Sequence, residues 1–203
     1  MSAATPPAQR RLLGALLVLL LLAQIDQPYP EAALLQHFPT MVLLVAAPAL
    51  LRRWPLSTAS VACIAAFMAL HTLGGRYAYS NVPYDDWGSA LTGTGLSDAF
   101  GWTRNHYDRL VHFAFGALSV IPGAEIARRW GGLGKRGAAL TVLGWVLTIS
   151  SLYEIFEWLL TIVAAGETAD RYNGQQGDIW DAQKDMALAA LGAILVLLVQ
   201  RRR

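Results

Sequence analysis

The stretch Gly177-Asp178-Ile179-Trp180-Asp181-Ala182-Gln183-Lys184-Asp185-Met186 leads directly into an apolar run, residues 186–199, near the end of the chain. If the run is helical, residues spaced i, i+3 and i+7 share one face, so Asp178, Asp181 and Asp185 form a single acidic stripe. The apolar run is typical of a membrane-embedded helix, on which acids are costly and usually functional or tightly paired. The stretch therefore predicts a site at the mouth of a membrane helix.

The composition agrees with a membrane protein. The chain has 203 residues, of which 55% are hydrophobic and 15% charged, and its mean hydropathy is +0.38. Soluble domains usually carry more charge, about 25%. The length suits one helical bundle, so we expect a single transmembrane domain over residues 1–203. The net charge of +2 is too small to indicate a nucleic-acid partner, and the single cysteine, Cys63, excludes an intrachain disulfide.

Apolar segments of about 20 residues divide the chain. We expect an all-α bundle of six transmembrane helices, over approximately 12–25, 33–51, 56–73, 107–126, 138–165 and 178–199. Pro39 and Pro48 are expected to kink the second helix, and Gly74-Gly75 to end the third. The first segment also fits a signal peptide, but no small-x-small cleavage pattern follows it, so we expect a retained helix.

Basic residues predict the orientation. Pairs or clusters of them occur at alternate ends of successive helices: Arg10/Arg11, Arg52/Arg53, Arg128/Arg129 with Lys135/Arg136, and the terminal arginines 201–203. The positive-inside rule then places both termini in the cytoplasm. The other face receives the loop 76–106 and the segment 166–177. Because long loops are often lids or binding elements, the loop 76–106 is a candidate lid.

Ionisable side chains occur in the outer thirds of the third to sixth helices. Asp108 and His112 are spaced i, i+4, and Glu154 and Glu157 are spaced i, i+3, so the members of each pair share a helix face. Buried acids at one depth would repel one another unless protons, Arg109, Lys184 or a metal ion neutralised them. Helix bundles build metal sites from such inward carboxylates and histidines. The candidate metal ligands are His71, Asp108, His112, Asp181 and Asp185, and the candidate catalytic residues are Glu154 and Glu157.

Mixed histidine and carboxylate ligands suit zinc, manganese or iron, whereas sites made of oxygen alone suit magnesium. A carboxylate left outside the ligand set would serve as general base toward a metal-activated water. Each residue also has a structural interpretation: Asp108 and Asp178 would cap helices, and Glu154 and Glu157 would pair with a base. The shared depth on four helices favours a functional site.

The chain resembles the YjdF-type family of bacterial inner-membrane proteins, a domain of unknown function. The resemblance extends over nearly the whole chain and implies a multi-span inner-membrane protein without an established reaction. Its motifs are 71–77 (His-Thr-Leu-Gly-Gly-Arg-Tyr), 104–113 (Arg-Asn-His-Tyr-Asp-Arg-Leu-Val-His-Phe), 153–158 (Tyr-Glu-Ile-Phe-Glu-Trp) and 174–186 (Gly-Gln-Gln-Gly-Asp-Ile-Trp-Asp-Ala-Gln-Lys-Asp-Met). A weaker similarity is to VanZ-like membrane proteins, which show an Asp-x-x-x-His helix start, but the loop 76–106 departs from that pattern.

Three function classes remain open. The first is a membrane-embedded metal-dependent hydrolase that acts on a lipid or envelope substrate. The second is an ion or proton transporter, although the chain shows no internal repeat of the kind that transporters use. The third is a structural or assembly factor in which the polar cluster locks helices together. Apart from the lipid bilayer and a divalent metal (Zn, Mn, Fe or Mg), the sequence indicates no partner or cofactor.

Overall fold

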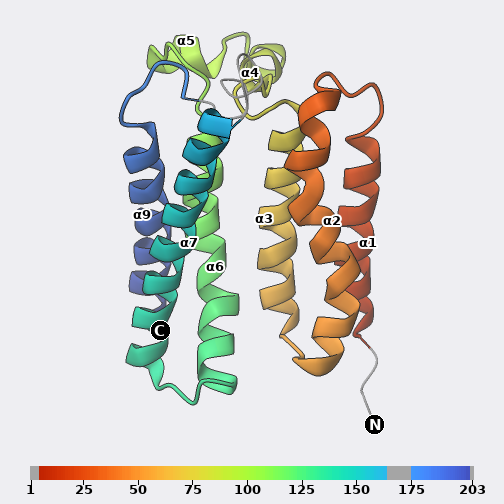
Figure 1. Cartoon of the computed structure of the whole chain (residues 1–203), viewed down its shortest axis with the longest axis vertical. Helices are drawn as coiled ribbons and strands as arrows, with labels where there is room; N and C mark the ends of the chain where they lie inside the picture. Colours follow the sequence, from red (N-terminus) through yellow and green to blue (C-terminus); the bar gives the residue numbers. More distant parts are fainter. Residues whose placement is uncertain (1–4, 164–174, 202–203) are drawn as a thin grey trace.

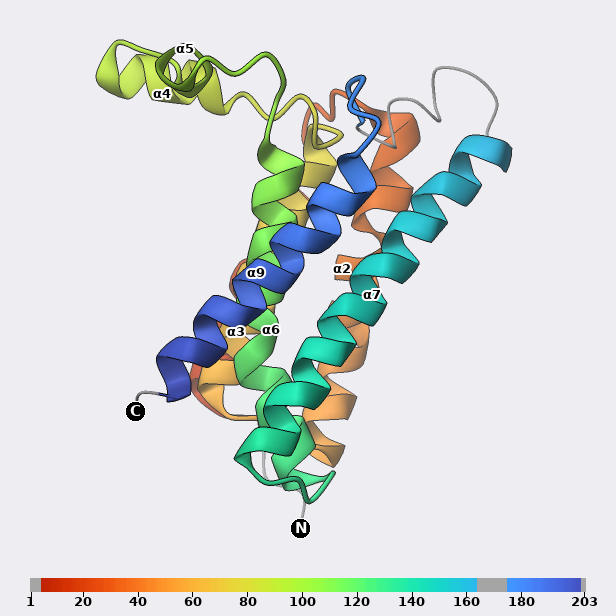
Figure 2. The ribbon, with the colours of Figure 1, turned by 90° about the vertical axis from the view of Figure 1, so that its left-hand side faces the viewer.

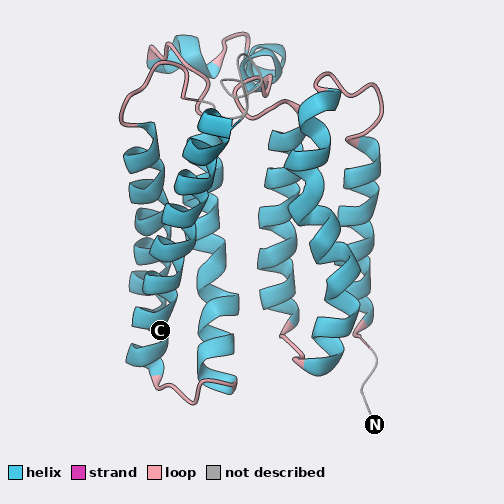
Figure 3. Ribbon diagram, viewed as in Figure 1, coloured by secondary structure: helices cyan, strands magenta, loops and turns pink. Residues whose placement is uncertain are grey.

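The computed structural model describes residues 5–163 and 175–201, and over these residues the chain is helical, with no strand among them (Figure 3). The helices are α1 (Pro7–Leu22), α2 (Pro30–Arg53), α3 (Thr58–Arg76), α4 (Tyr84–Thr92), α5 (Leu96–Phe100), α6 (Tyr107–Arg129), α7 (Lys135–Val163) and α9 (Asp181–Arg201). The expected end of the fifth membrane helix (164–165), most of the segment 166–177 and the last two arginines lie outside the described residues.

Five of the described helices are long and apolar enough to cross a membrane: α2, α3, α6, α7 and α9. Helix α1 has 16 residues, which gives a length of ~24 Å, and it is not among the five although it lies beside α3 in the bundle (Figure 1). The expected all-helical membrane bundle is therefore confirmed, with five candidate spans in place of the six that we predicted.

The long helices form two groups, α1–α3 and α6, α7 and α9 (Figure 1). Helices α3 and α6 pack against each other and join the groups. The start of α1 and the end of α9 lie at one end of the bundle, with the α2–α3 and α6–α7 turns (Figure 1). We call this the arginine end, because its basic residues are Arg10, Arg11, Arg52, Arg53, Arg128, Arg129, Lys135, Arg136 and Arg201. The short helices lie at the opposite end, here named the α4–α5 end (Figure 2).

The third helix continues through Gly74-Gly75 to Arg76 and does not end there as predicted. A Cβ on Gly75 would lie 3.0 Å from atoms of Gln36 and His37 on α2, and a Cβ on Gly74 would lie 2.8 Å from the ring of Tyr79. These glycines therefore allow close approach of neighbouring groups and do not break the helix. The last helix starts three residues later than predicted, at Asp181, and α2 continues through both of its internal prolines.

Small residues bring α6 and α9 into backbone contact. A Cβ on Gly116 would lie 1.8 Å from the carbonyl oxygen of Ala189, and a Cβ on Gly192 would lie 2.2 Å from that of Phe113. Membrane helices associate through such small residues because apolar burial gives little driving force between helices in lipid. The close contact sets the register in which the first turns of α6 and α9 face each other, and those turns carry the predicted acids.

The loop 76–106 is folded and carries α4 and α5. The carboxylate of Asp85 accepts hydrogen bonds from the backbone amide of Ser97 (2.7 Å) and from its hydroxyl (2.6 Å). These bonds lower the pKa of Asp85 and tie the start of α5 to α4. Leu91 is 86% exposed and Phe100 is 65% exposed. The loop therefore presents apolar side chains at the α4–α5 end; its role as a lid stays a prediction.

Candidate functional site

Two arginines, one just before α6 and one in its first turn, neutralise acids of α6 and of the α9 entry. The guanidinium of Arg104 forms ion pairs with Asp108 and Asp181. Arg109 Nη2 lies 2.5 Å from Asp178 Oδ2 and 3.4 Å from Asp181 Oδ1. Only 5% of the Asp181 side chain and 10% of the Arg104 side chain are exposed. Guanidinium groups stay charged in proteins, so these acids have buried counter-charges.

Asp178 precedes α9 and does not extend its helical face. Its carboxylate accepts a hydrogen bond from Lys184 Nζ (2.5 Å) and one from the backbone amide of Trp180 (3.1 Å). The second bond is the Asx turn that aspartate forms with its own backbone two residues on, which suits a helix entry. The hydrogen bonds from Lys184, Trp180 and Arg109 lower the pKa of Asp178 to about 2. Asp178 is therefore a charged structural residue in front of the helix.

A second polar set comprises His112 of α6, Glu154 of α7 and Asp185 of α9. Each residue offers a ligand atom, and these atoms lie within 4.8 Å of one another. His112 Nε2 is 3.5 Å from Glu154 Oε1. Glu154 Oε1 and Asp185 Oδ1 are buried and have no hydrogen-bond partner among the described residues, and Asp185 is 4% exposed. Buried oxygens without a hydrogen-bond partner are rare, and a proton, a water or an ion usually accounts for them.

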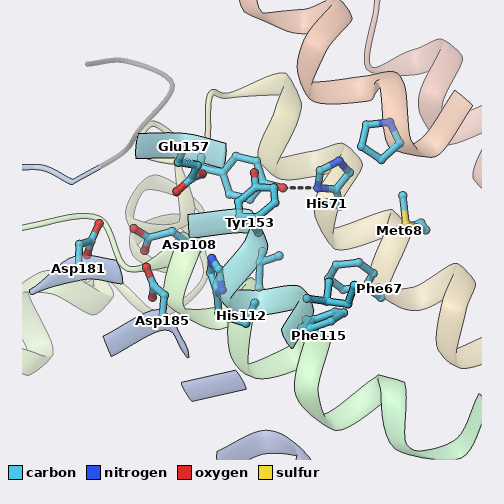
Figure 4. Close-up of a pocket in the computed structure, with 15 residues that line it drawn as sticks. Phe67, Met68, His71, Asp108, His112, Phe115, Tyr153, Glu157, Asp181 and Asp185 are labelled. Atoms are coloured by element: carbon cyan, nitrogen blue, oxygen red, sulfur yellow. Dashed lines mark hydrogen bonds between the residues drawn. The ribbon is translucent and has the colours of Figure 1, made fainter. Parts of the chain in front are cut away.

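The acids Asp108, Asp181 and Asp185 form another group with ligand atoms within 4.8 Å of one another. Asp185 belongs to both groups, so it lies between the arginine pairs and His112. In Figure 4, Asp108 and His112 project from α6 toward Asp181 and Asp185 on α9. The structure thus brings together four of the five predicted metal ligands, together with one of the two predicted catalytic acids, Glu154.

Apart from Glu154, the residues of these two ligand groups line a cavity of about 200 Å³ between the two helix groups. Its polar wall includes Asp108, His112, Glu157, Asp181 and Asp185. The rest of the wall is largely apolar or aromatic, and Figure 4 shows Phe67, Met68 and Phe115 in it. Its other residues are Pro39, His71, Tyr79, Val111, Ile149, Ser150 and Tyr153. Ligand sites usually combine apolar walls with a few convergent polar groups in this way.

The predicted ligand His71 lies in the cavity wall but outside both ligand groups. Its Nδ1 is hydrogen-bonded to the hydroxyl of Tyr79 (Figure 4). Ala78 and Tyr79 have positive φ angles of 47° and 53°, which L-residues rarely adopt, and this turn folds Tyr79 back over Gly74. His71 is therefore positioned by Tyr79 on the α3 side of the cavity, and its role as a ligand stays a prediction. Glu157 lines the same cavity.

Sequence reasoning missed three residues at or near the site: Arg104, Tyr79 and His37. Arg104 is four residues before Asp108, a spacing that indicates an ion pair if helix geometry extends that far. Tyr79 gave no signal, because its position depends on the turn after α3. His37 is buried between α2 and α3, where its Nδ1 accepts from Gln24 (2.8 Å) and its Nε2 donates to the carbonyl oxygen of Thr72 (3.1 Å).

A bundle of candidate membrane-spanning helices around a buried polar cluster defines a multi-span membrane protein. The chain belongs to the family described as predicted membrane protein (DUF2238), whose model matches residues 8–203. A relative, inner membrane protein YjdF of Escherichia coli (strain K12), is 33% identical over 172 residues, which are 83% of this chain and 77% of that protein. No solved structure matches the chain. The resemblance and the inner-membrane location predicted from the sequence are confirmed.

Proposed function

We propose that this protein is a membrane-embedded metal-dependent hydrolase whose ion is held by His112, Glu154 and Asp185. The charge distribution carries the proposal. Among the described residues, the acids 108, 178 and 181 are ion-paired with Arg104, Arg109 and Lys184. Among the described residues, neither Glu154 nor Asp185 forms an ion pair with an arginine or lysine, although Asp185 is buried and the Glu154 side chain is only 9% exposed. A divalent cation would supply the missing positive charge.

The donor set also indicates the ion. One imidazole with two carboxylates suits zinc, manganese or iron better than magnesium, which prefers oxygen ligands. Glu154 joins the ligand set in this proposal, whereas its predicted role was catalytic. Glu157 then remains as a carboxylate in the cavity wall that belongs neither to this ligand set nor to the arginine-paired acids Asp108 and Asp181. A bound metal of this kind lowers the pKa of a coordinated water.

Hydrolysis at this site needs one proton acceptor. Glu157 would take the proton from the attacking water as the new bond to the substrate's carbonyl carbon or phosphorus forms. It would return that proton to the leaving oxygen as the old ester bond breaks, so that water is added across the bond. We infer a lipid or envelope ester as substrate, because the cavity lies inside a membrane bundle and is largely apolar.

Metal analysis of the purified protein tests the proposal. We expect stoichiometric zinc, manganese or iron by elemental analysis, and its loss in His112→Ala and Asp185→Asn, because each change removes a ligand atom. Asp178→Asn is the matched control: it alters an acid of the same cluster that is already paired, and it should retain the metal. Absence of metal from folded wild-type protein would refute the function and leave the cluster as an interhelical lock.

We further propose that α1 is a sixth span and that both termini are cytoplasmic. The antiparallel course of the long helices and the collection of basic residues at the arginine end support this orientation (Figure 1). The candidate site then lies toward the periplasmic side, near the α4–α5 end.

A further inference from the structure

A second hollow adjoins the cavity between α2 and α7. It has a volume of about 330 Å³ and is lined by Leu35, Phe38, Pro39, His71, Ile149, Leu152, Tyr153 and Phe156. Four of these residues also line the cavity beside the candidate metal ligands: Pro39, His71, Ile149 and Tyr153. The two hollows are therefore neighbours that share a wall. We name the second hollow the α2–α7 groove.

The α2–α7 groove opens toward lipid. Phe38 is 58% exposed on α2, and Leu152 is 55% exposed on α7. Both helices are candidate membrane spans. Apolar side chains exposed on membrane-spanning helices face hydrocarbon, which is the medium around such a segment. The substance at the mouth of the groove is therefore the hydrocarbon chain of a membrane lipid, whereas a water-soluble compound would have to cross the bilayer core to reach it.

The polar and apolar residues that line the two hollows lie at different depths along the helices. Asp185 follows the start of α9 by four residues, a rise of ~6 Å. Pro39 and Phe67 lie nine residues from the α4–α5 ends of their helices, a rise of ~14 Å. Half of a bilayer hydrocarbon core is ~15 Å thick. Asp185 thus lies nearer the α4–α5 ends of the helices than Pro39 and Phe67 do, the same order as the polar head and the hydrocarbon chain of a lipid in one leaflet.

We propose that the cavity and the α2–α7 groove bind one membrane amphiphile, which enters sideways between α2 and α7 with its hydrocarbon chain in the groove and its polar head at His112, Glu154 and Asp185. This inference rests on the proposed function, because it assigns a substrate class to the same site. A lipid ester in this position has its chain in the apolar part and its polar bond beside the candidate metal ligands.

Photocrosslinking tests the inference independently of the metal. The full chain is reconstituted in phosphatidylethanolamine–phosphatidylglycerol vesicles that contain a trace of phosphatidylglycerol with a diazirine in mid-chain. We expect mass spectrometry to find adducts concentrated on groove residues of α2 and α7. Ile149→Trp fills the shared wall, and groove adducts should fall about tenfold, since overfilling a packed site is disfavoured by amounts of that order.

Two further variants serve as a second test of the groove and as a control outside it. Leu152→Trp narrows the groove from its exposed mouth, where a change is tolerated by the fold, and it should also reduce the adducts. Leu140→Trp, at a residue of α7 that is 72% exposed and outside the groove, should leave them unchanged. Adducts spread evenly over the lipid-facing helices and unaffected by Ile149→Trp and Leu152→Trp would overturn the inference. Groove adducts on a protein that lacks metal would sustain the inference while refuting the metal-dependent hydrolase.

Discussion

Arg104 is the residue on which the balance of charge at the site depends. It binds Asp108 in the first turn of α6 and Asp181 on α9, and little of any of the three side chains reaches solvent. Removing one partner of a buried ion pair leaves the other charge uncompensated, at a cost of about 3–5 kcal/mol. We therefore expect Arg104→Ala to destabilise the protein strongly, as measured by its unfolding midpoint in mild detergent.

Lys184→Ala is the matched control for this prediction. Lys184 also binds an acid of the cluster, but its side chain is 48% exposed. Exposed ion pairs contribute only about 0–1 kcal/mol, so the midpoint should change little. An equal effect of the two substitutions would mean that the Arg104 pairs are not buried in the folded protein.

The acids of the site could be predicted from the sequence, but their division into two sets could not. Charged residues in apolar segments are visible in any sequence, and Asp108, His112 and Asp185 stand out for that reason. Their partners depend on the register between α6 and α9, which no local pattern encodes. The sequence alone therefore suggested that Asp181 and Asp185 are equivalent, although the structure pairs Asp181 with arginine and leaves Asp185 beside His112.

At the scale of the elements, the α6–α9 contact holds the candidate site together. A side chain at Gly116 would collide with the α9 backbone at Ala189, and overpacking commonly costs about 1–3 kcal/mol even where side chains can adjust. We expect Gly116→Leu to lower the unfolding midpoint and to remove the metal, because the helices that carry His112 and Asp185 must separate. The two readouts are the unfolding curve and elemental analysis of the folded fraction.

Gly144→Ala provides the comparison for a glycine in a membrane helix. Nothing lies within 4 Å of a Cβ built at Gly144 on α7. Alanine is the better helix former by about 0.5–1 kcal/mol, so this variant should be as stable as the wild type or slightly more stable. If the Gly116→Leu protein were as stable as the Gly144→Ala protein, the close packing of α6 on α9 would be contradicted.

The positions of the helices followed well from apolar run length, whereas several of their ends lie three to five residues from the predicted positions. The ends depend on tertiary contacts: Gly74 and Gly75 lie under Tyr79 and against α2, so the helix continues where glycine usually indicates an end. At the start of α9, Asp178 turns out of the helix to meet Arg109 and Lys184. Local patterns identify a helix, and the neighbours decide where it begins and ends.

At the scale of the whole molecule, the cavity and the α2–α7 groove arise where the two helix groups meet. Their walls combine residues of α2 and α3 with residues of α6, α7 and α9. The sequence contains no signal for this meeting, because each helix shows only its own apolar surface. The orientation that we propose for the bundle, in contrast, rests on the basic residues, and it decides from which side of the membrane the candidate site is reached.

Two topologies differ in whether helix α1 spans the membrane. If it spans the membrane, residue 5 lies in the cytoplasm and residue 27, beyond the far end of α1, lies in the periplasm; if it does not, both lie on the same side. We expect a membrane-impermeant thiol reagent to label Gln27→Cys and Thr94→Cys in intact cells, and Thr5→Cys and Gly134→Cys only after permeabilisation, all in a Cys63→Ala background. Thr94 and Gly134 are the controls for the two faces, because they lie in opposite end turns of the bundle.

Labelling of Thr5→Cys in intact cells would reduce the bundle to five spans with the N-terminus outside. Labelling of Gly134→Cys but not Thr94→Cys in intact cells would invert the bundle and turn the candidate site toward the cytoplasm.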